Sequence, residues 1–283
     1  MRLHLLGSSA GKPVPRPFCS CRVCRAALER GGRDIRTRTT LQLYPGDSAA
    51  ERFRTPRYQV DLSPDFVHQL IRERIDPSRL EHLLITHPDA DHLHVEYLAI
   101  RSTLRSPVAD LPVLHIYGNH LVEEAIRAKL PNLEAVRCAF HRVEDGERFT
   151  CGELEVTAFR AMHRGPRCLH YAVDDGRHKV LLAWDGTWEE EVWERLRSWR
   201  FDAVGMECTH LGPSDHEMSG HLTLQQFVAV RRRLVAAGVV AEDSPFFATH
   251  IGDNGALTYD EALAVAGREG FIVGYDGMVL DLE

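Results

Sequence analysis

The 283-residue sequence has no apolar segment long enough to cross a bilayer. It also has no Gly/Ser-rich, Pro-rich or low-complexity stretch that would divide it. Its first residues lack the long apolar core of a secretory signal peptide. We therefore expect a cytoplasmic protein without membrane contact, in which residues 1–283 form one domain. The hydrophobic share of 44% is enough for a large core.

Positive charge is in deficit. The chain has 34 Lys and Arg residues against 41 Asp and Glu residues, for a net charge of −7. Proteins that bind duplex nucleic acid usually carry a basic face, so this balance argues against such a partner. Two short basic clusters are typical of solvated surface; they are Arg33, Arg36, Arg38 and Arg231, Arg232, Arg233.

The seven cysteines are an odd number, and three of them form a C-x-C-x2-C cluster: Cys19, Cys21 and Cys24. In a reducing compartment such a cluster indicates metal binding rather than disulfides. Three thiolates can close on one zinc ion if a fourth ligand comes from elsewhere in the chain. The alternative is that the three thiols hold no ligand.

The densest group of polar side chains follows the apolar run from His82 to Ile85, which predicts a buried strand. Burying imidazoles and carboxylates without partners costs several kcal/mol each. A divalent metal ion removes this cost, because neutral His and ionised Asp are both good ligands. We therefore predict a metal site rather than a solvated loop, built from His87, Asp89, Asp91, His92 and, less directly, His94.

Three further ligand-type residues follow apolar strands: His163 after residues 154–161, Asp185 after 179–183 and His250 after 246–249. Strand ends and the loops after them are where layered α/β proteins build their sites. The strand-rich halves, each closed by helices, predict two packed sheets with helices outside, a four-layer αββα sandwich.

The same patterns predict the remaining elements. We expect helix starts at Ser63-Pro64, at Thr187 with Glu190, at Thr223 with Gln226 and at Thr258 with Glu261. The residues Trp188, Val192, Leu196 and Trp199 should form the apolar stripe of one helix. We also expect helices over 21–30, 94–105 and 119–130, strands over 2–7, 39–44, 58–62, 113–118, 168–173 and 201–207, and a closing hairpin of 272–275 with 278–282.

The stretch Thr-His-Pro-Asp-Ala-Asp-His, which ends at His92, resembles the His-x-His-x-Asp-His signature loop of the metallo-β-lactamase superfamily. Asp89 stands where that loop usually has its second His. Within the superfamily the chain is most similar to the PhnP-like phosphodiesterases, the phosphoribosyl cyclic phosphodiesterase group. The likeness covers nearly the whole chain and includes Leu-Leu-Gly-Ser-Ser-Ala-Gly at residues 5–11, the three-Cys cluster, Gly-His-Leu-Thr-Leu at 220–224 and Gly-Phe-Ile-Val-Gly-Tyr-Asp-Gly-Met at 270–278.

This resemblance implies the αββα fold and a dinuclear metal site. One ion would take His87, Asp89 and His163, the other Asp91, His92 and His250, and Asp185 would bridge them. The expected reaction is hydrolysis of a small cyclic or nucleotide-like phosphodiester by a metal-activated hydroxide. The catalytic residues would be Asp91 and His221, the latter serving the leaving group, while His94 would orient a ligand or contact substrate.

The resemblance also implies a structural zinc on the three cysteines. The group's fourth ligand is a His three residues after the last active-site His; here that position is Asp253. In the active site the extra carboxylate of Asp89 admits manganese or iron as well as zinc. The sequence leaves a homodimer open.

Three alternative readings remain. The chain could be a relative of PqqB, the metallo-β-lactamase-like protein of pyrroloquinoline quinone synthesis. It could be a catalytically degenerate scaffold that binds metal or a partner. It could also be a tRNA-processing nuclease of the same fold, although the acidic net charge counts against this.

Overall fold

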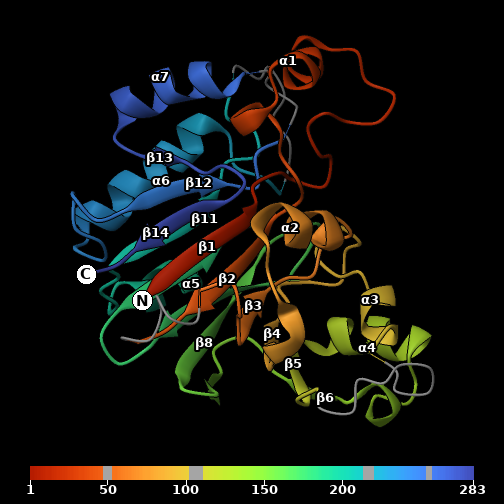
Figure 1. Ribbon diagram of the computed structural model, residues 1–283. Coiled ribbons are helices and arrows are strands. Elements are labelled where there is room, and N and C mark those ends of the chain that lie inside the picture. The colour runs from red at the N-terminus through yellow and green to blue at the C-terminus, as the bar shows by residue number, and fades with distance from the viewer. Residues whose placement is uncertain (47–52, 102–110, 213–219, 253–256) are drawn as a thin grey trace.

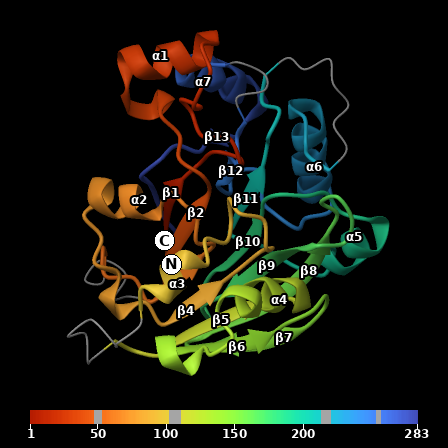
Figure 2. The ribbon, with the colours of Figure 1, turned by 90° about the vertical axis from the view of Figure 1, so that its right-hand side faces the viewer.

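The computed structural model describes residues 1–46, 53–101, 111–212, 220–252 and 257–283. Two sheets pack face to face and helices cover their outer surfaces (Figures 1 and 2). The predicted four-layer αββα sandwich is therefore confirmed. None of the helices in the described ranges combines the length and the apolar character needed to span a membrane.

The first sheet runs in the order β14-β1-β2-β3-β4-β5-β6. Its pairs are antiparallel from β14 to β3 and parallel from β3 to β6. The helices that follow its strands are α2 (Phe66–Glu73), α3 (Glu96–Ala99) and α4 (His120–Lys129). The strands are β1 Arg2–Gly7, β2 Thr40–Tyr44, β3 Tyr58–Val60, β4 His82–Leu84, β5 Leu114–Gly118, β6 Cys138–Arg142 and β14 Met278–Asp281.

The second sheet runs in the order β13-β12-β11-β10-β9-β8-β7. Its pairs are antiparallel from β7 to β10 and parallel from β10 to β13. Its helices are α5 (Glu190–Leu196), α6 (Leu224–Ala236) and α7 (Tyr259–Glu269), and α1 (Arg22–Arg30) lies beside α7 in Figure 1. The strands are β7 Arg148–Cys151, β8 Leu154–Ala161, β9 Cys168–Asp174, β10 Lys179–Ala183, β11 Ala203–Glu207, β12 Phe246–Thr249 and β13 Ile272–Val273.

The main apolar core lies between the two sheets, where Leu41, Leu43, Val156 and Leu182 are almost wholly buried. Separate apolar clusters join each sheet to its helices, so the central strands are covered on both faces. Each fully buried aliphatic side chain of this kind contributes roughly 1.5–3 kcal/mol. This coverage explains why the strands read as continuous apolar runs, and it fixes the strand ends that carry the polar residues described below.

The expected closing hairpin is wrong. Ile272–Val273 pairs with β12 in the second sheet, whereas Met278–Asp281 pairs with β1 in the first. The Asp276-Gly277 segment is therefore a crossover between sheets. Its carboxylate is buried in this crossover, where Asp276 accepts hydrogen bonds from the backbone N–H groups of Ser8 at 2.9 Å and Thr37 at 2.7 Å.

Two helix starts differ from the prediction. Helix α2 begins at Phe66 with Asp65 as its N-cap residue, not at the Ser63-Pro64 pair. Helix α5 begins at Glu190, because Thr187 is held in an antiparallel bridge with Met162 instead of capping the helix. Asp185 therefore does not lie directly before a helix N-terminus.

Of the other predicted helix features, some are confirmed and some are not. The capping boxes Thr223 with Gln226 and Thr258 with Glu261 are confirmed. Of the helix expected over 94–105, only Glu96–Ala99 is helical, and residues 102–105 lie outside the described part of the chain. Of the expected helical stripe, only Val192 and Leu196 lie in α5, where both are buried. Trp188 precedes the helix and Trp199 follows it, and both are partly buried against the same core cluster.

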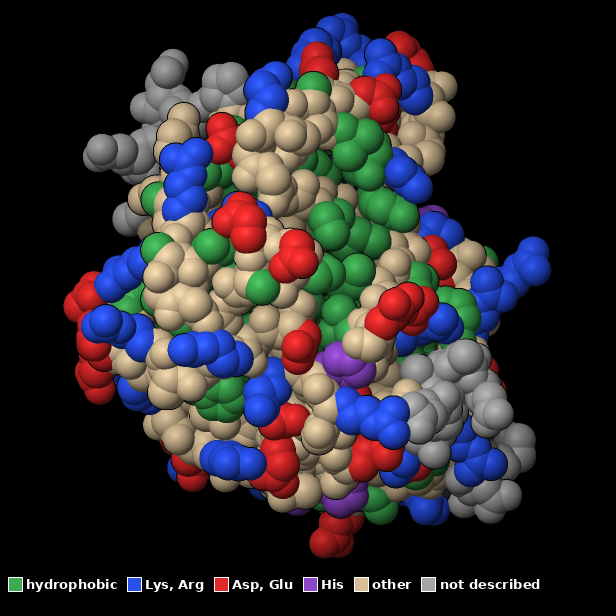
Figure 3. Space-filling model, turned by 90° about the vertical axis from the view of Figure 1, so that its left-hand side faces the viewer, with side chains coloured by type: hydrophobic (Ala, Val, Ile, Leu, Met, Phe, Trp, Pro, Cys, Tyr) green, Lys and Arg blue, Asp and Glu red, His purple; other side chains and the backbone are tan. Residues whose placement is uncertain are grey.

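Acidic and basic side chains are interspersed on the face of the molecule shown in Figure 3, around a central apolar patch. That face carries no continuous basic surface, in keeping with the net charge of −7.

Candidate metal centre

The predicted ligands converge at one end of the sandwich. The loops after β4, β8, β10 and β12 carry His87, His163, Asp185 and His250, respectively. Because β4 and β12 belong to different sheets, the site is built from both halves of the fold. The predicted ligands form two groups whose ligand atoms lie within 4.8 Å of one another: His87, Asp89 and His163, and Asp91, His92, Asp185 and His250. Two overlapping groups within the same limit include His221, one with His163 and Asp185 and the other with Glu207 and His250.

Asp185 lies at the centre of this arrangement. Its Oδ2 atom is 3.0 Å from Nε2 of His87, 3.3 Å from Nε2 of His92 and 3.7 Å from Nε2 of His250. Its Oδ1 atom is 3.1 Å from Nδ1 of His163. One buried carboxylate therefore faces ligands of both groups, which is the position that a bridging anion needs.

In three of these imidazoles the ring nitrogen that points away from Asp185, Nδ1, makes a hydrogen bond. Nδ1 of His92 lies 2.7 Å from Oδ2 of Asp61, Nδ1 of His87 lies 3.0 Å from Oγ1 of Thr86, and Nδ1 of His250 lies 2.9 Å from Oγ1 of Thr209. Such partners orient metal-binding histidines and fix their tautomer.

The hydroxyl groups have other acceptors for their protons. Thr86 donates to Asp61 at 3.0 Å, and Thr209 donates to Glu207 at 2.6 Å. The Asp61 carboxylate can likewise only accept a hydrogen bond. Each of the three Nδ1 atoms must therefore carry the hydrogen and act as the donor. The three Nε2 lone pairs then point at the Asp185 carboxylate, which is itself an acceptor. Acceptors that face acceptors require positive charge between them, supplied either by protons on the imidazoles or by metal ions.

Unsatisfied buried atoms lead to the same conclusion. Nε2 of His87, Nδ1 of His163 and Oδ1 of Asp185 are buried and make no hydrogen bond, although ion-pair distances among them are short. Leaving such atoms unpaired costs about 1–3 kcal/mol each. Divalent metal ions would satisfy them, so the donor set fits the metal that the sequence predicts.

The electrostatics of the site favour a cation. Burial would raise the pKa of Asp185, but the neighbouring imidazoles of His250 and His87 outweigh it and hold that pKa well below its usual range. Burial lowers the pKa of His92, yet the carboxylates of Asp91 and Asp61 raise it overall, well above its ordinary value. The cluster thus holds ionised carboxylates in a buried place, where positive charge is needed.

Three residues of the site adopt left-handed backbone conformations that side chains rarely take. The φ angles are 61° at Asp61, 67° at Asp185 and 51° at His250. Non-glycine residues in such regions cost of order 1–3 kcal/mol and persist where the surroundings impose them, often at functional sites. Here the turn at the end of each strand aims the side chain into the cluster.

Asp61 and Glu207 are the functional residues that the sequence reasoning missed. Asp61 is fully buried and also accepts from the backbone N–H of Thr86 and from Nε1 of Trp184, both at 2.8 Å. Glu207 is fully buried at the end of β11 and accepts from the N–H of Gly186 at 2.6 Å. The available signal was an acidic residue at the end of an otherwise apolar strand.

His221 lies beside the metal cluster. Its Nδ1 atom is 3.2 Å from Oε2 of Glu207 and 3.3 Å from Oδ1 of Asp185. Burial lowers the pKa of His221, but the hydrogen bond to Glu207 and the charges of Glu207 and Asp185 together outweigh burial and raise it above the ordinary value. His221 thus lies at the edge of the cluster, in contact with two carboxylates.

A cavity of about 550 Å³ opens over the cluster. The cavity is lined by three carboxylates and three imidazoles of the site, namely Asp89, Asp91, Asp185, His163, His221 and His250. The basic residues Lys12 and Arg164 and the imidazole of His210 also line it. His94 does not belong to this lining; it packs against Tyr97 with ring centroids 4.5 Å apart and lies 3.5 Å from Glu96. The geometry thus gives His94 no contact with the centre.

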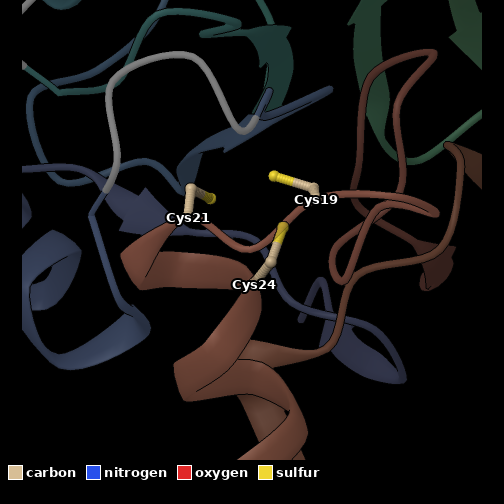
Figure 4. A group of neighbouring side chains, drawn as sticks. All are labelled: Cys19, Cys21 and Cys24. Atoms are coloured by element: carbon tan, nitrogen blue, oxygen red, sulfur yellow. The ribbon is translucent and has the colours of Figure 1, made fainter.

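The cysteine cluster lies at the start of α1, with Cys19 in the preceding loop, Cys21 at the N-cap position and Cys24 in the first turn of the helix. In Figure 4 the three sulfurs point toward one another, and they lie within 4.8 Å of each other without a disulfide. A backbone hydrogen bond at Cys21 lowers the pKa of Cys19 to about 7, whereas burial raises the pKa of Cys24 to about 11. The predicted fourth ligand, Asp253, lies outside the described residues.

A family model described as the beta-lactamase superfamily domain matches residues 57–263. The chain therefore belongs to the metallo-β-lactamase superfamily, as its signature loop predicts. No curated protein matches the sequence.

Solved structures with this fold include three that align along nearly the whole chain. A diphosphatase from the PhnP family has 21% identity and a TM-score of 0.74, with 99% of this chain and 97% of the other aligned. Zinc-bound PqqB from Methylobacterium extorquens has 18% identity and a TM-score of 0.72, with both chains fully covered. The short form of human tRNase Z has 18% identity and a TM-score of 0.64, also with full coverage. At these identities the likeness shows the fold alone.

Proposed function

We propose that this protein is a metal-dependent phosphodiesterase that hydrolyses a small cyclic or nucleotide-like phosphodiester. The observation that carries the proposal is the convergence of three imidazole Nε2 atoms on the Asp185 carboxylate, at 3.0, 3.3 and 3.7 Å. One ion would be held by His87, Asp89 and His163, the other by Asp91, His92 and His250, with Asp185 between them. Divalent ions there would supply Lewis acidity and acidify water near neutral pH.

The residues around the centre suit an anionic substrate. Lys12, Arg164 and His210 line the cavity and can bind phosphate oxygens. The volume of about 550 Å³ fits a small molecule. His221, kept charged by Glu207, would give a proton to the leaving alkoxide, a role typical of a general acid.

The test combines metal analysis with turnover of bis(p-nitrophenyl) phosphate by protein reconstituted with zinc, manganese or iron. Two bound ions and turnover support the proposal. Metal without turnover of any phosphodiester would favour the degenerate scaffold. Metal binding with turnover in a reaction other than phosphodiester hydrolysis would favour the alternative of a PqqB-like protein, whose fold is similar.

We also propose that Cys19, Cys21 and Cys24 hold a structural zinc ion, with Asp253 or a nearby group as the fourth ligand. Supporting this proposal, the three sulfurs converge without forming a disulfide. Anomalous scattering at the zinc edge tests it, and the absence of metal at the sulfurs would contradict it.

A further inference from the structure

The carboxylate of Asp89 faces two ways. Its Oδ2 atom lies 3.7 Å from Nε2 of His87 and 3.5 Å from Nε2 of His163, toward the metal centre. Its Oδ1 atom lies 3.2 Å from Nη2 of Arg167, on the other side. One oxygen is thus available to an ion while the other is bound to a guanidinium group.

The backbone holds Arg167 in this place. Its N–H donates to the carbonyl of Gly165 at 2.9 Å, in the loop that also carries His163. Its own carbonyl accepts from Nδ2 of Asn119 at 2.9 Å, and Asn119, which is 3% exposed, caps α4. The backbone of Arg167 is therefore anchored to the same loop as one of the candidate ligands and to the helix beside it, and the guanidinium group reaches Asp89 from there.

Charge accounts for the pairing. An imidazole at position 89 would be a neutral ligand, whereas Asp89 adds one negative charge to a centre that already contains Asp91 and Asp185. Arg167 adds one positive charge at the outer oxygen. The Asp89–Arg167 pair therefore adds no net charge to the ligand set. In this respect it equals the neutral imidazole that it replaces.

We propose that Arg167 is a positioning residue that compensates Asp89, so that the two side chains act together as one neutral ligand for the first metal ion. The inference rests on the proposed metal centre and goes beyond it, because it assigns Arg167 the control of that ion's affinity. The same pair fixes which carboxylate oxygen faces the ion. The low pKa of Asp89, caused by contact with His163 and by the charges of His87 and Arg167, agrees with an ionised pair.

The experiment is a double-mutant cycle on metal affinity. Metal-free wild type, Arg167→Gln, Asp89→His and the double variant are titrated with Mn²⁺ by calorimetry, with a chelator competing. The binding step that changes in Asp89→His identifies the first ion. Arg167→Gln should tighten that step roughly tenfold, within the range of coupling between contacting residues, because Asp89 is left as an uncompensated anion. In the Asp89→His background the same substitution should change it by less than about twofold.

Two controls separate the pair from general electrostatics. Arg167→Lys keeps the charge and should leave the first step near its wild-type affinity. Arg164→Gln removes a cation that belongs to the same loop and lines the cavity over the centre, and it should tighten the first step much less than Arg167→Gln does. Equal tightening by both glutamine variants would overturn the inference.

The remaining outcomes are distinct. If wild type binds two ions and Arg167→Gln changes neither affinity while raising KM, Arg167 is a substrate ligand and the inference fails alone. An equal effect of Arg167→Gln in both backgrounds would also overturn it. If wild type binds no ion, both the inference and the proposed metal centre fail.

Discussion

The two candidate metal centres of this molecule are built in contrasting ways. The His/Asp centre takes its side chains from loops after strands of both sheets, and Asp61, Thr86 and Thr209 brace its imidazoles. The cysteine cluster spans six consecutive residues at the junction of a loop and α1, with Cys19 and Cys21 partly exposed. Its local core contains only Val14, Val23 and Ala27 among the buried described residues.

The two centres differ in whether a metal ion would be needed to order the surrounding protein. The fold already orders the His/Asp ligands, so an ion there need not organise the protein and can be used for chemistry. The cysteine loop has little packing of its own, so an ion there would contribute to its folding.

The largest effect is expected from Asp185→Ala, which removes the carboxylate between the two ligand groups. The variant should lose both active-site ions and lower turnover on the order of 10³-fold or more, because several kcal/mol of transition-state stabilisation are lost. Metal content and phosphodiester turnover measure this. A variant that kept both ions would show that Asp185 does not bridge them. Metal at the cysteine cluster should remain.

His221→Ala should reduce turnover by about 10²–10⁴-fold and leave the metal content unchanged if His221 is the proposed proton donor and not a ligand. Metal analysis beside steady-state kinetics measures both. His94→Ala is the matched control: this histidine lies against Tyr97, away from the cavity lining, and its loss should leave the rate near wild type. Loss of a metal ion from His221→Ala would show that it is a ligand.

Asp61→Asn tests the bracing itself. The amide cannot accept all the donors that Asp61 receives from Thr86, Trp184 and His92. We expect metal affinity to fall about 10–100-fold and the free energy of unfolding to fall by about 1–3 kcal/mol. Calorimetry and urea denaturation measure these. Asp65→Asn is the control, since Asp65 pairs with Arg38 near the surface and should cost less than about 1 kcal/mol. Equal metal affinity in Asp61→Asn and wild type would remove the bracing role.

The sequence predicted the candidate ligands better than their supports. His87, His163, Asp185 and His250 could be found because each is a metal-binding residue type directly after an apolar strand. Asp61 and Glu207 also stand at strand ends, but this position does not distinguish a carboxylate that supports the ligands from one that binds the ion. Their roles depend on Trp184 and Gly186, which only the packed sheets bring within hydrogen-bonding distance. The spacing of residues along the sequence does not predict such tertiary contacts.

The errors in the fold have a similar cause. Asp276-Gly277 has the composition of a hairpin turn, yet the chain crosses there from one sheet to the other because Ser8 and Thr37 bind the Asp276 carboxylate. Strands β6 and β7 were not predicted, since both have partly exposed, polar residues that blur the apolar pattern. Tertiary pairing with β5 and β8 decides their conformation.

The smallest effect is expected at the cysteine cluster, and it should be local. Removing zinc with a chelator, or Cys24→Ser, should speed amide hydrogen exchange in residues 12–24. The N–H groups of Arg16 and Cys19 lie in this loop, and the former donates to the sulfur of Cys24 at 3.3 Å. Strands β4, β10 and β12 should keep their protection after chelation, because the main core and the bracing hydrogen bonds do not depend on the ion. Exchange in 12–24 that is unaffected by either change would mean that the cluster needs no metal. Loss of protection in the three strands would mean that the His/Asp centre is not preformed, and the contrast between the two centres would fail.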